Sequence, residues 1–171
     1  MGLRDKLFVL IFLLLLPLIL VLVGIAVLCW FMKGVWLGLL IRLRWYREGK
    51  RVLFVYSDSP NWKEYIDVNI LPKIGSQAVV LNWSERRQWD WKRRSVEFQV
   101  FRHWTFIKRY SLKGKVVWDG SEFNPIAITF VPWWWPRVFR FWQPFKDFKH
   151  GKEKPLRILE GKLFKVLNVA G

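Results

Sequence analysis

LFVLIFLLLLPLILVLVGIAVLCWFM, residues 7–32, is a run of 26 residues near the start of the chain without a charged side chain. As an α-helix that rises about 1.5 Å per residue, it would be roughly 39 Å long. This length exceeds the ~30 Å hydrocarbon core of a bilayer, so the helix could span the core with some tilt. Pro17 and Gly24 do not oppose this, because membrane helices tolerate both residue types. The run therefore predicts a transmembrane helix that anchors the rest of the chain.

The flanks of this run predict that it is retained and how it is oriented. A cleaved secretory signal has an apolar region of about 7–15 residues and ends in small residues, whereas this run is longer and ends in Trp-Phe-Met. Arg4 and Lys6 precede it. Six basic residues follow it closely: Lys33, Arg42, Arg44, Arg47, Lys50 and Arg51. The positive-inside rule then predicts a single-pass protein of the cell (inner) membrane, with its N-terminus outside and its C-terminal domain cytoplasmic.

The charge of the chain indicates its partners. It has 29 basic and 13 acidic residues, a net charge of +16, and nearly all of this excess follows residue 32. A basic cytoplasmic domain is attracted to the anionic inner leaflet by about 1 kcal/mol for each basic residue near the surface. The predicted partner is therefore the lipid bilayer with its anionic headgroups, and other membrane proteins are expected as well. Nucleic acid, the other common polyanion, is the less favoured alternative.

Cysteine and histidine are too rare for several kinds of chemistry. Cys29 is the single cysteine and lies inside the apolar run, which excludes disulfides within the chain, cysteine-based zinc sites and dithiol chemistry. The two histidines and the carboxylates show no metal-ligand spacing, and the sequence contains no glycine-rich phosphate loop. We therefore expect neither a cofactor nor a metal.

Tryptophan and arginine cluster where the chain would leave the membrane. Residues 33–50 combine leucines at helical spacing with basic side chains, which favours an amphipathic helix resting in the membrane interface. The alternative is that the first helix simply continues beyond the membrane. Three tryptophans between Pro132 and Pro136 predict a loop that dips into the headgroups, or one that packs on the domain's own sheet. The residues predicted to face the membrane are Trp36, Arg42, Arg44, Trp45, Arg47, Trp133, Trp134 and Trp135.

Residues 51–171 predict one α/β domain, after a transmembrane segment at 1–32 and a juxtamembrane segment at 33–50. Short apolar runs at 52–56 and 78–81 predict strands, and helical patterns follow them at 60–71 and 85–103. Residues 116–118 suit a short edge strand. Residues 125–131 and 137–142 predict an antiparallel hairpin, and residues 154–167 predict a terminal helix. The strand–helix–strand unit requires two parallel strands.

This element order resembles that of the thioredoxin-like fold family, βαβαββα. In that family a proline, usually with a cis peptide bond, opens the third core strand, and Asn124-Pro125-Ile126 stands at the matching place. The family's Cys-x-x-Cys motif would fall at residues 57–62, which here read Ser-Asp-Ser-Pro-Asn-Trp. The resemblance covers residues 51–168 and implies the fold without the family's redox activity.

Residues 57–61 are also the candidate ligand site. Open α/β sheets bind ligands beyond the carboxyl ends of their strands, and free N–H groups at the start of a helix favour anions. The candidate ligand-binding residues, for a phosphate or a carboxylate, are Ser57, Asp58, Ser59, Asn61 and Pro125. The alternative is a helix cap and turn formed by the same side chains. The charge of Asp58 favours that alternative, because it would repel an anion.

No catalytic residue is predicted. His150 follows Asp147 by three residues and could form an acid–base pair with it, but the sequence places no nucleophile nearby. The predicted function is a non-redox, membrane-anchored interaction or scaffold module with a basic, aromatic surface toward the membrane. Two alternatives stay open. One is a membrane-bound transferase or hydrolase acting on a phosphorylated or lipid-linked substrate at residues 57–61. The other is a membrane-tethered protein that binds nucleic acid through residues 137–148.

Overall fold

The chain forms two compact units, Met1–Trp36 and Leu37–Gly171. The computed structural model describes residues 2–85, 95–105, 109–112, 115–118, 124–132 and 136–169. The boundary between the units falls inside one long helix, α1 (Leu3–Arg44), so this helix contributes to both units.

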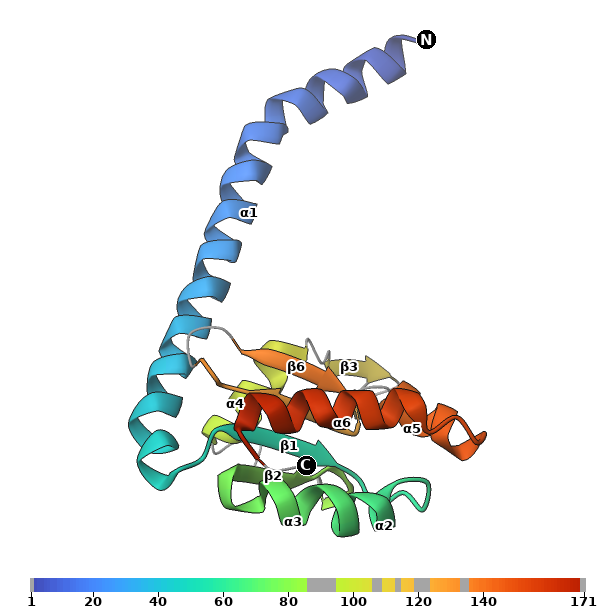
Figure 1. The fold of residues 1–171 in the computed structure, drawn as a ribbon. Helices are drawn as coiled ribbons and strands as arrows, with labels where there is room; N and C mark the ends of the chain where they lie inside the picture. The colour runs from blue at the N-terminus through green and yellow to red at the C-terminus, as the bar shows by residue number, and fades with distance from the viewer. Residues whose placement is uncertain are drawn as a thin grey trace. The chain divides into compact units, whose positions relative to one another are not determined.

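The first unit consists of the N-terminal part of α1 (Figure 1). Most of its described side chains are apolar and exposed, including Leu14, Leu20 and Phe31. Within the part of the chain that the structure describes, α1 is the one helix long and apolar enough to cross a membrane. A helix that is apolar on every side suits surroundings that are themselves apolar.

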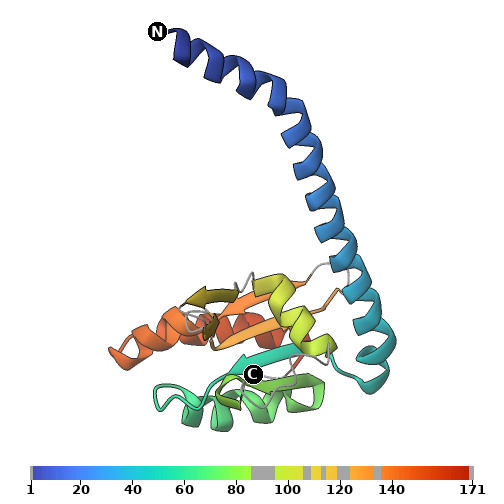
Figure 2. The same cartoon turned by 180° about the vertical axis from the view of Figure 1, so that it is seen from behind.

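The second unit is built on a four-stranded sheet in the order β2-β1-β5-β6 (Figures 1 and 2). β1 (Val52–Tyr56) pairs in parallel with β2 (Ala78–Asn82). β5 (Ile126–Thr129) runs antiparallel to β1, and β6 (Arg137–Arg140) runs antiparallel to β5. The predicted mixed sheet, with its parallel pair and its antiparallel hairpin, is therefore confirmed.

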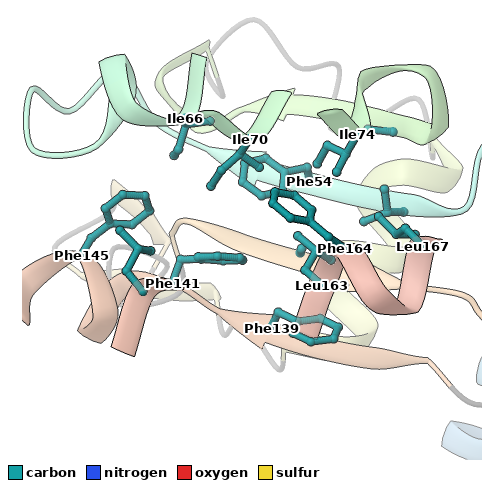
Figure 3. Close-up of a cluster of buried hydrophobic side chains, with 14 residues drawn as sticks. Phe54, Ile66, Ile70, Ile74, Phe139, Phe141, Phe145, Leu163, Phe164 and Leu167 are labelled. Carbon is teal, nitrogen blue, oxygen red and sulfur yellow. The ribbon is translucent and has the colours of Figure 1, made fainter. Parts of the chain in front are cut away.

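One face of this sheet is covered by helical segments from two parts of the chain. Between β1 and β2 lie α2 (Lys63–Tyr65), the π-helical turn η2 (Ile66–Ile70), α3 (Leu71–Ile74) and the short 3-10 helix η3 (Gly75–Gln77). After β6 come α5 (Trp142–Lys149) and α6 (Lys154–Leu167). Figure 3 shows Ile66, Ile70 and Ile74 pointing toward Phe54 of β1, with side chains of α6 completing the cluster. Their spacing of four residues places the three isoleucines on one side of the helix.

The opposite face is covered by α4 (Val96–Thr105) and by the end of α1 (Figure 2). Leu53 and Val55 point to this face, whereas Val52 and Phe54 point to the other, because successive residues of a strand alternate. The buried residues on this side are Ile41, Trp45, Leu53, Val55, Trp83, Val100, Phe101, Ile126, Ile128 and Phe130.

The segment at 33–50 continues the first helix and contributes to the core of the second unit. α1 continues to Arg44, and a 3-10 turn, η1 (Tyr46–Glu48), follows it. Leu37 and Ile41 are fully buried in the core of the second unit, and Trp45 is 1 % exposed. Ile41 and Trp45 therefore pack with the core on the sheet, whereas Trp36, Leu39 and Leu43 stay exposed, and the compact unit begins at Leu37. The first helix thus continues without a break past the apolar run.

Two further elements depart from the sequence prediction. α5 begins at Trp142, where a strand was predicted to end. Pro144 lies in the first turn of this helix, where proline is tolerated, but its presence made the helix difficult to predict from the sequence. β3 (Arg109–Leu112) pairs with β4 (Lys115–Trp118) in a separate two-stranded sheet. The predicted helix at 85–103 is described only from Val96, after the 3-10 turn η4 (Trp83–Glu85).

Candidate functional site

Asp58 is the centre of a polar cluster at the carboxyl ends of β1 and β2. Its carboxylate pairs with Lys63 Nζ at 2.6 Å and accepts a hydrogen bond from Asn82 Nδ2 at 3.0 Å. Its backbone N–H donates to Ser84 Oγ at 2.9 Å. Asn82 Nδ2 also donates to Glu85 Oε1 at 3.3 Å. The loop after β1 is thus joined to the loop after β2.

The other polar residues of this loop bond within the loop and to α5. Ser59 Oγ accepts hydrogen bonds from the backbone N–H of Asn61 at 3.4 Å and from its side-chain amide at 3.3 Å. Trp62 Nε1 donates to the Ser57 carbonyl at 3.1 Å, and Lys149 Nζ of α5 donates to Asn61 Oδ1 at 3.0 Å. These bonds are those of a polar turn that is also tied to α5 and to the loop after β2. They match the turn alternative, and binding of a ligand at residues 57–61 stays a prediction.

The electrostatics of the cluster oppose binding of an anion. Hydrogen bonds from Lys63 and Asn82 hold the pKa of the Asp58 carboxyl below its ordinary value. The hydrogen bond to Asp58 in turn raises the pKa of Lys63. Asp58 is therefore ionised at neutral pH, and its charge would repel a phosphate or carboxylate placed beside it.

Pro125 lies at the same end of the sheet as this loop. Val55 is paired with Ile126, so the residue before Ile126 lies beside the end of β1, where the loop begins. Pro125 is buried, the Asn124–Pro125 peptide bond is cis, and the Pro125 carbonyl accepts a hydrogen bond from the Phe141 N–H at 2.8 Å. Strand pairing therefore brings both parts of the candidate site to one edge of the sheet.

The two histidines belong to α5 and α4. His150 is exposed at the C-cap of α5, and the Asp147 carboxylate accepts a hydrogen bond from Gln143 Nε2 at 3.1 Å. His103 is buried in α4 with its ring edge-on to Trp104, at a centroid distance of 4.8 Å. The Asp147 carboxylate is thus occupied by Gln143, and an acid–base role for His150 gains no support from it.

A buried carboxylate that the sequence analysis missed lies between α2 and α6. Glu160 is 5 % exposed, and its Oε2 accepts a hydrogen bond from the Tyr65 hydroxyl at 3.1 Å. Arg157 Nη1 donates to the same hydroxyl at 2.8 Å and lies 3.8 Å from Glu160 Oε2. Burial raises the pKa of Glu160, and burial together with the bond to Glu160 raises the pKa of Tyr65 to about 12. The sequence could have indicated this burial, because helical spacing places Glu160 on the same side of α6 as Leu156 and Leu163, which are both buried.

The residues predicted to face a membrane separate into three groups. The exposed ones are Trp36, Arg42, Arg44 and Arg47. Trp45 is instead buried and packs edge-on against Phe130, with ring centroids 5.7 Å apart. Its assignment is therefore corrected: helical spacing from Ile41 turns the indole toward the sheet. The last three, Trp133, Trp134 and Trp135, lie outside the described residues.

An open groove of about 430 Å³ lies where the end of α1, η1 and the start of α4 come together. Its lining consists of Leu40, Leu43, Arg44, Arg47, Glu48 and Val96. Leu43 is 58 % exposed, and both arginines are exposed. Apolar walls beside guanidinium groups suit a ligand that is itself apolar at one end and charged at the other.

Among the described residues, no group of three or more histidine, cysteine, aspartate or glutamate side chains is placed to hold a metal ion. Comparisons of the chain with protein-family models, curated proteins and solved structures found no match.

Proposed function

We propose that this protein is a single-pass, membrane-anchored interaction module whose basic domain lies in the cytoplasm against anionic lipid headgroups. The continuity of α1 carries the proposal. This helix of 42 residues contains an exposed apolar stretch and then contributes Leu37 and Ile41 to the core of the α/β unit. The same helix therefore supplies both the proposed anchor and a part of the domain.

The charge distribution supports the cytoplasmic side and the lipid partner. The net charge of +16 lies almost entirely after the apolar run, and Arg44 and Arg47 are exposed directly beyond it. Basic residues next to a membrane helix favour retention on the cytoplasmic side. Each one held near an anionic leaflet contributes about 1 kcal/mol to membrane binding.

The proposed domain type is a thioredoxin-like fold without redox chemistry. Support comes from the order β1, α2–α3, β2, α4, β5, β6, α6, into which this chain inserts the β3–β4 hairpin before β5 and α5 after β6. It also comes from the parallel β1–β2 pair and from Pro125 immediately before β5. Where the family carries its two cysteines, this chain has the polar turn at residues 57–62. The polar groups of that turn bond to one another and to neighbouring loops, as suits a structural role more than a catalytic one.

Binding of the unit Leu37–Gly171 to vesicles tests this function. We expect it to float with phosphatidylcholine vesicles that contain phosphatidylglycerol, and to bind pure phosphatidylcholine far less, at about 0.15 M salt. Asp58→Asn is the matched variant, because it alters the polar turn and should leave vesicle binding unchanged. Equal binding to both kinds of vesicle would refute the lipid-facing surface. A strong loss of vesicle binding in Asp58→Asn would indicate that the polar turn, and not the basic surface, binds the vesicles.

A further inference from the structure

We propose that the groove beside the end of α1 binds a single anionic phospholipid. In this site Arg44 and Arg47 hold the phosphate, and Leu40, Leu43 and Val96 contact the start of an acyl chain. The inference rests on the proposed membrane anchoring, since the lipid comes from the leaflet that α1 enters, and it adds a defined ligand site to a general surface attraction.

The size and the lining of the groove fit such a ligand. Its volume of about 430 Å³ falls within the roughly 300–1,000 Å³ typical of small-molecule sites. That space suits a headgroup with the beginning of one chain, and the remaining methylenes would stay with the bilayer. Leu43 is 58 % exposed and the neighbouring Leu39 is 39 % exposed, so apolar surface is available beside the arginines.

The charges favour an anionic ligand. Within the residues that the structure describes, the guanidinium groups of Arg44 and Arg47 have no hydrogen-bond or ion-pair partner. Guanidinium groups bind phosphate oxygens in pairs of parallel hydrogen bonds. Glu48 also lines the groove and carries the opposite charge, so the lining has a net charge of +1. Its carboxylate can accept a hydrogen bond from a headgroup hydroxyl, as phosphatidylglycerol offers.

The position of the groove along the chain, shortly after the apolar run, indicates lipid as the source of the phosphate. Leu40 follows Met32, the last residue of the apolar run, by eight residues, which is about 12 Å along a helix. The headgroup layer extends about 5–7 Å beyond the hydrocarbon core. Tilt of α1 and the length of the arginine side chains therefore have to bring the groove to the phosphates, which are the most abundant anions there. Long basic side chains just past an apolar helix commonly reach for them.

Native mass spectrometry of the full chain in a neutral detergent tests the site. The chain is titrated with short-chain phosphatidylglycerol or phosphatidylcholine, and the bound lipids are counted. We expect one phosphatidylglycerol to bind more tightly than the rest. Because the double variant Arg44→Gln/Arg47→Gln removes both guanidinium groups from the phosphate, it should weaken this binding about 30-fold.

The matched control is Lys162→Gln/Lys165→Gln, which removes the same charge from exposed positions on α6. It should change the affinity of the tight lipid less than about 2-fold. Equal losses in both double variants would overturn the groove while leaving the general attraction to anionic surfaces intact. Absence of a tight phosphatidylglycerol in the parent chain would also overturn it, and the vesicle experiment decides separately on the proposed surface.

Discussion

At the scale of single residues, Trp45 shows that the end of α1 is part of a folded core. Its indole is 1 % exposed and packs against Phe130. We expect Trp45→Ala to lower the free energy of unfolding by about 3–5 kcal/mol, because a large cavity would be left in the core. Guanidinium unfolding of Leu37–Gly171 measures this loss. Leu43→Ala, at a residue 58 % exposed, is the control and should change stability little. Similar losses in the two variants would contradict the burial of Trp45.

Glu160 makes a pH-dependent contribution at the same scale. Burial raises its pKa, so the folded state holds the proton more tightly than the unfolded state does. Its stabilising contribution is therefore present below the ordinary glutamate pKa and is lost as pH rises through the raised folded-state pKa. Glu160→Gln keeps an acceptor for the Tyr65 hydroxyl and removes the buried charge.

We expect the stability advantage of Glu160→Gln over the parent to grow as pH rises from about 4 to 7. Urea unfolding of Leu37–Gly171 across this range measures it. Glu153→Gln removes a carboxylate that is 62 % exposed and should show a flat difference. If the advantage of Glu160→Gln shrank toward neutral pH, the interactions with Tyr65 and Arg157 would lower the pKa of Glu160 by more than burial raises it.

At the scale of elements, the last turns of α1 act as a domain helix. Leu37 and Ile41, together with Trp45 directly after the helix, are buried in the second unit, and burial of each large apolar side chain contributes about 1.5–3 kcal/mol. A fragment that starts at residue 50 should therefore have a free energy of unfolding lower by several kcal/mol, and it should expose the side chains that α1 covers. The fragment Leu37–Gly171 should unfold cooperatively. Thermal unfolding with an apolar dye compares the two fragments. Equal melting temperatures would contradict this role.

At the scale of the whole molecule, the proposed anchor and the basic surface should respond differently to salt. Charge screening shortens to about 3 Å at 1 M salt, which weakens binding through exposed basic residues, whereas apolar burial in lipid persists. The full chain should therefore stay with membranes washed in 1 M salt, and added Leu37–Gly171 should be released. Release of the full chain by that wash would contradict the anchor. Fractionation followed by immunoblotting measures both.

Much of the secondary structure follows from local patterns in the sequence. β1 was predicted at its observed bounds because Val52–Tyr56 is apolar and rich in strand formers, and α6 because leucines recur at helical spacing. α5 was missed because a short helix with Pro144 in its first turn has few repeats to reveal its period. The polar turn at residues 57–61 was among the alternatives, but its bonds to Asn82 and Lys149 depend on the pairing of distant segments.

The sequence by itself determined the long apolar helix, the excess of positive charge after it and the succession of strands and helices, because these depend on composition and short-range periodicity. Only the tertiary structure decided what covers each apolar side. A stripe at helical spacing has the same pattern whether lipid or protein lies against it, so Trp45 could be assigned to the core only once α1 was seen to pack on the sheet. The burial of Glu160 beside Tyr65 was decided in the same way, since packing brings α6 onto α2 from the far end of the chain.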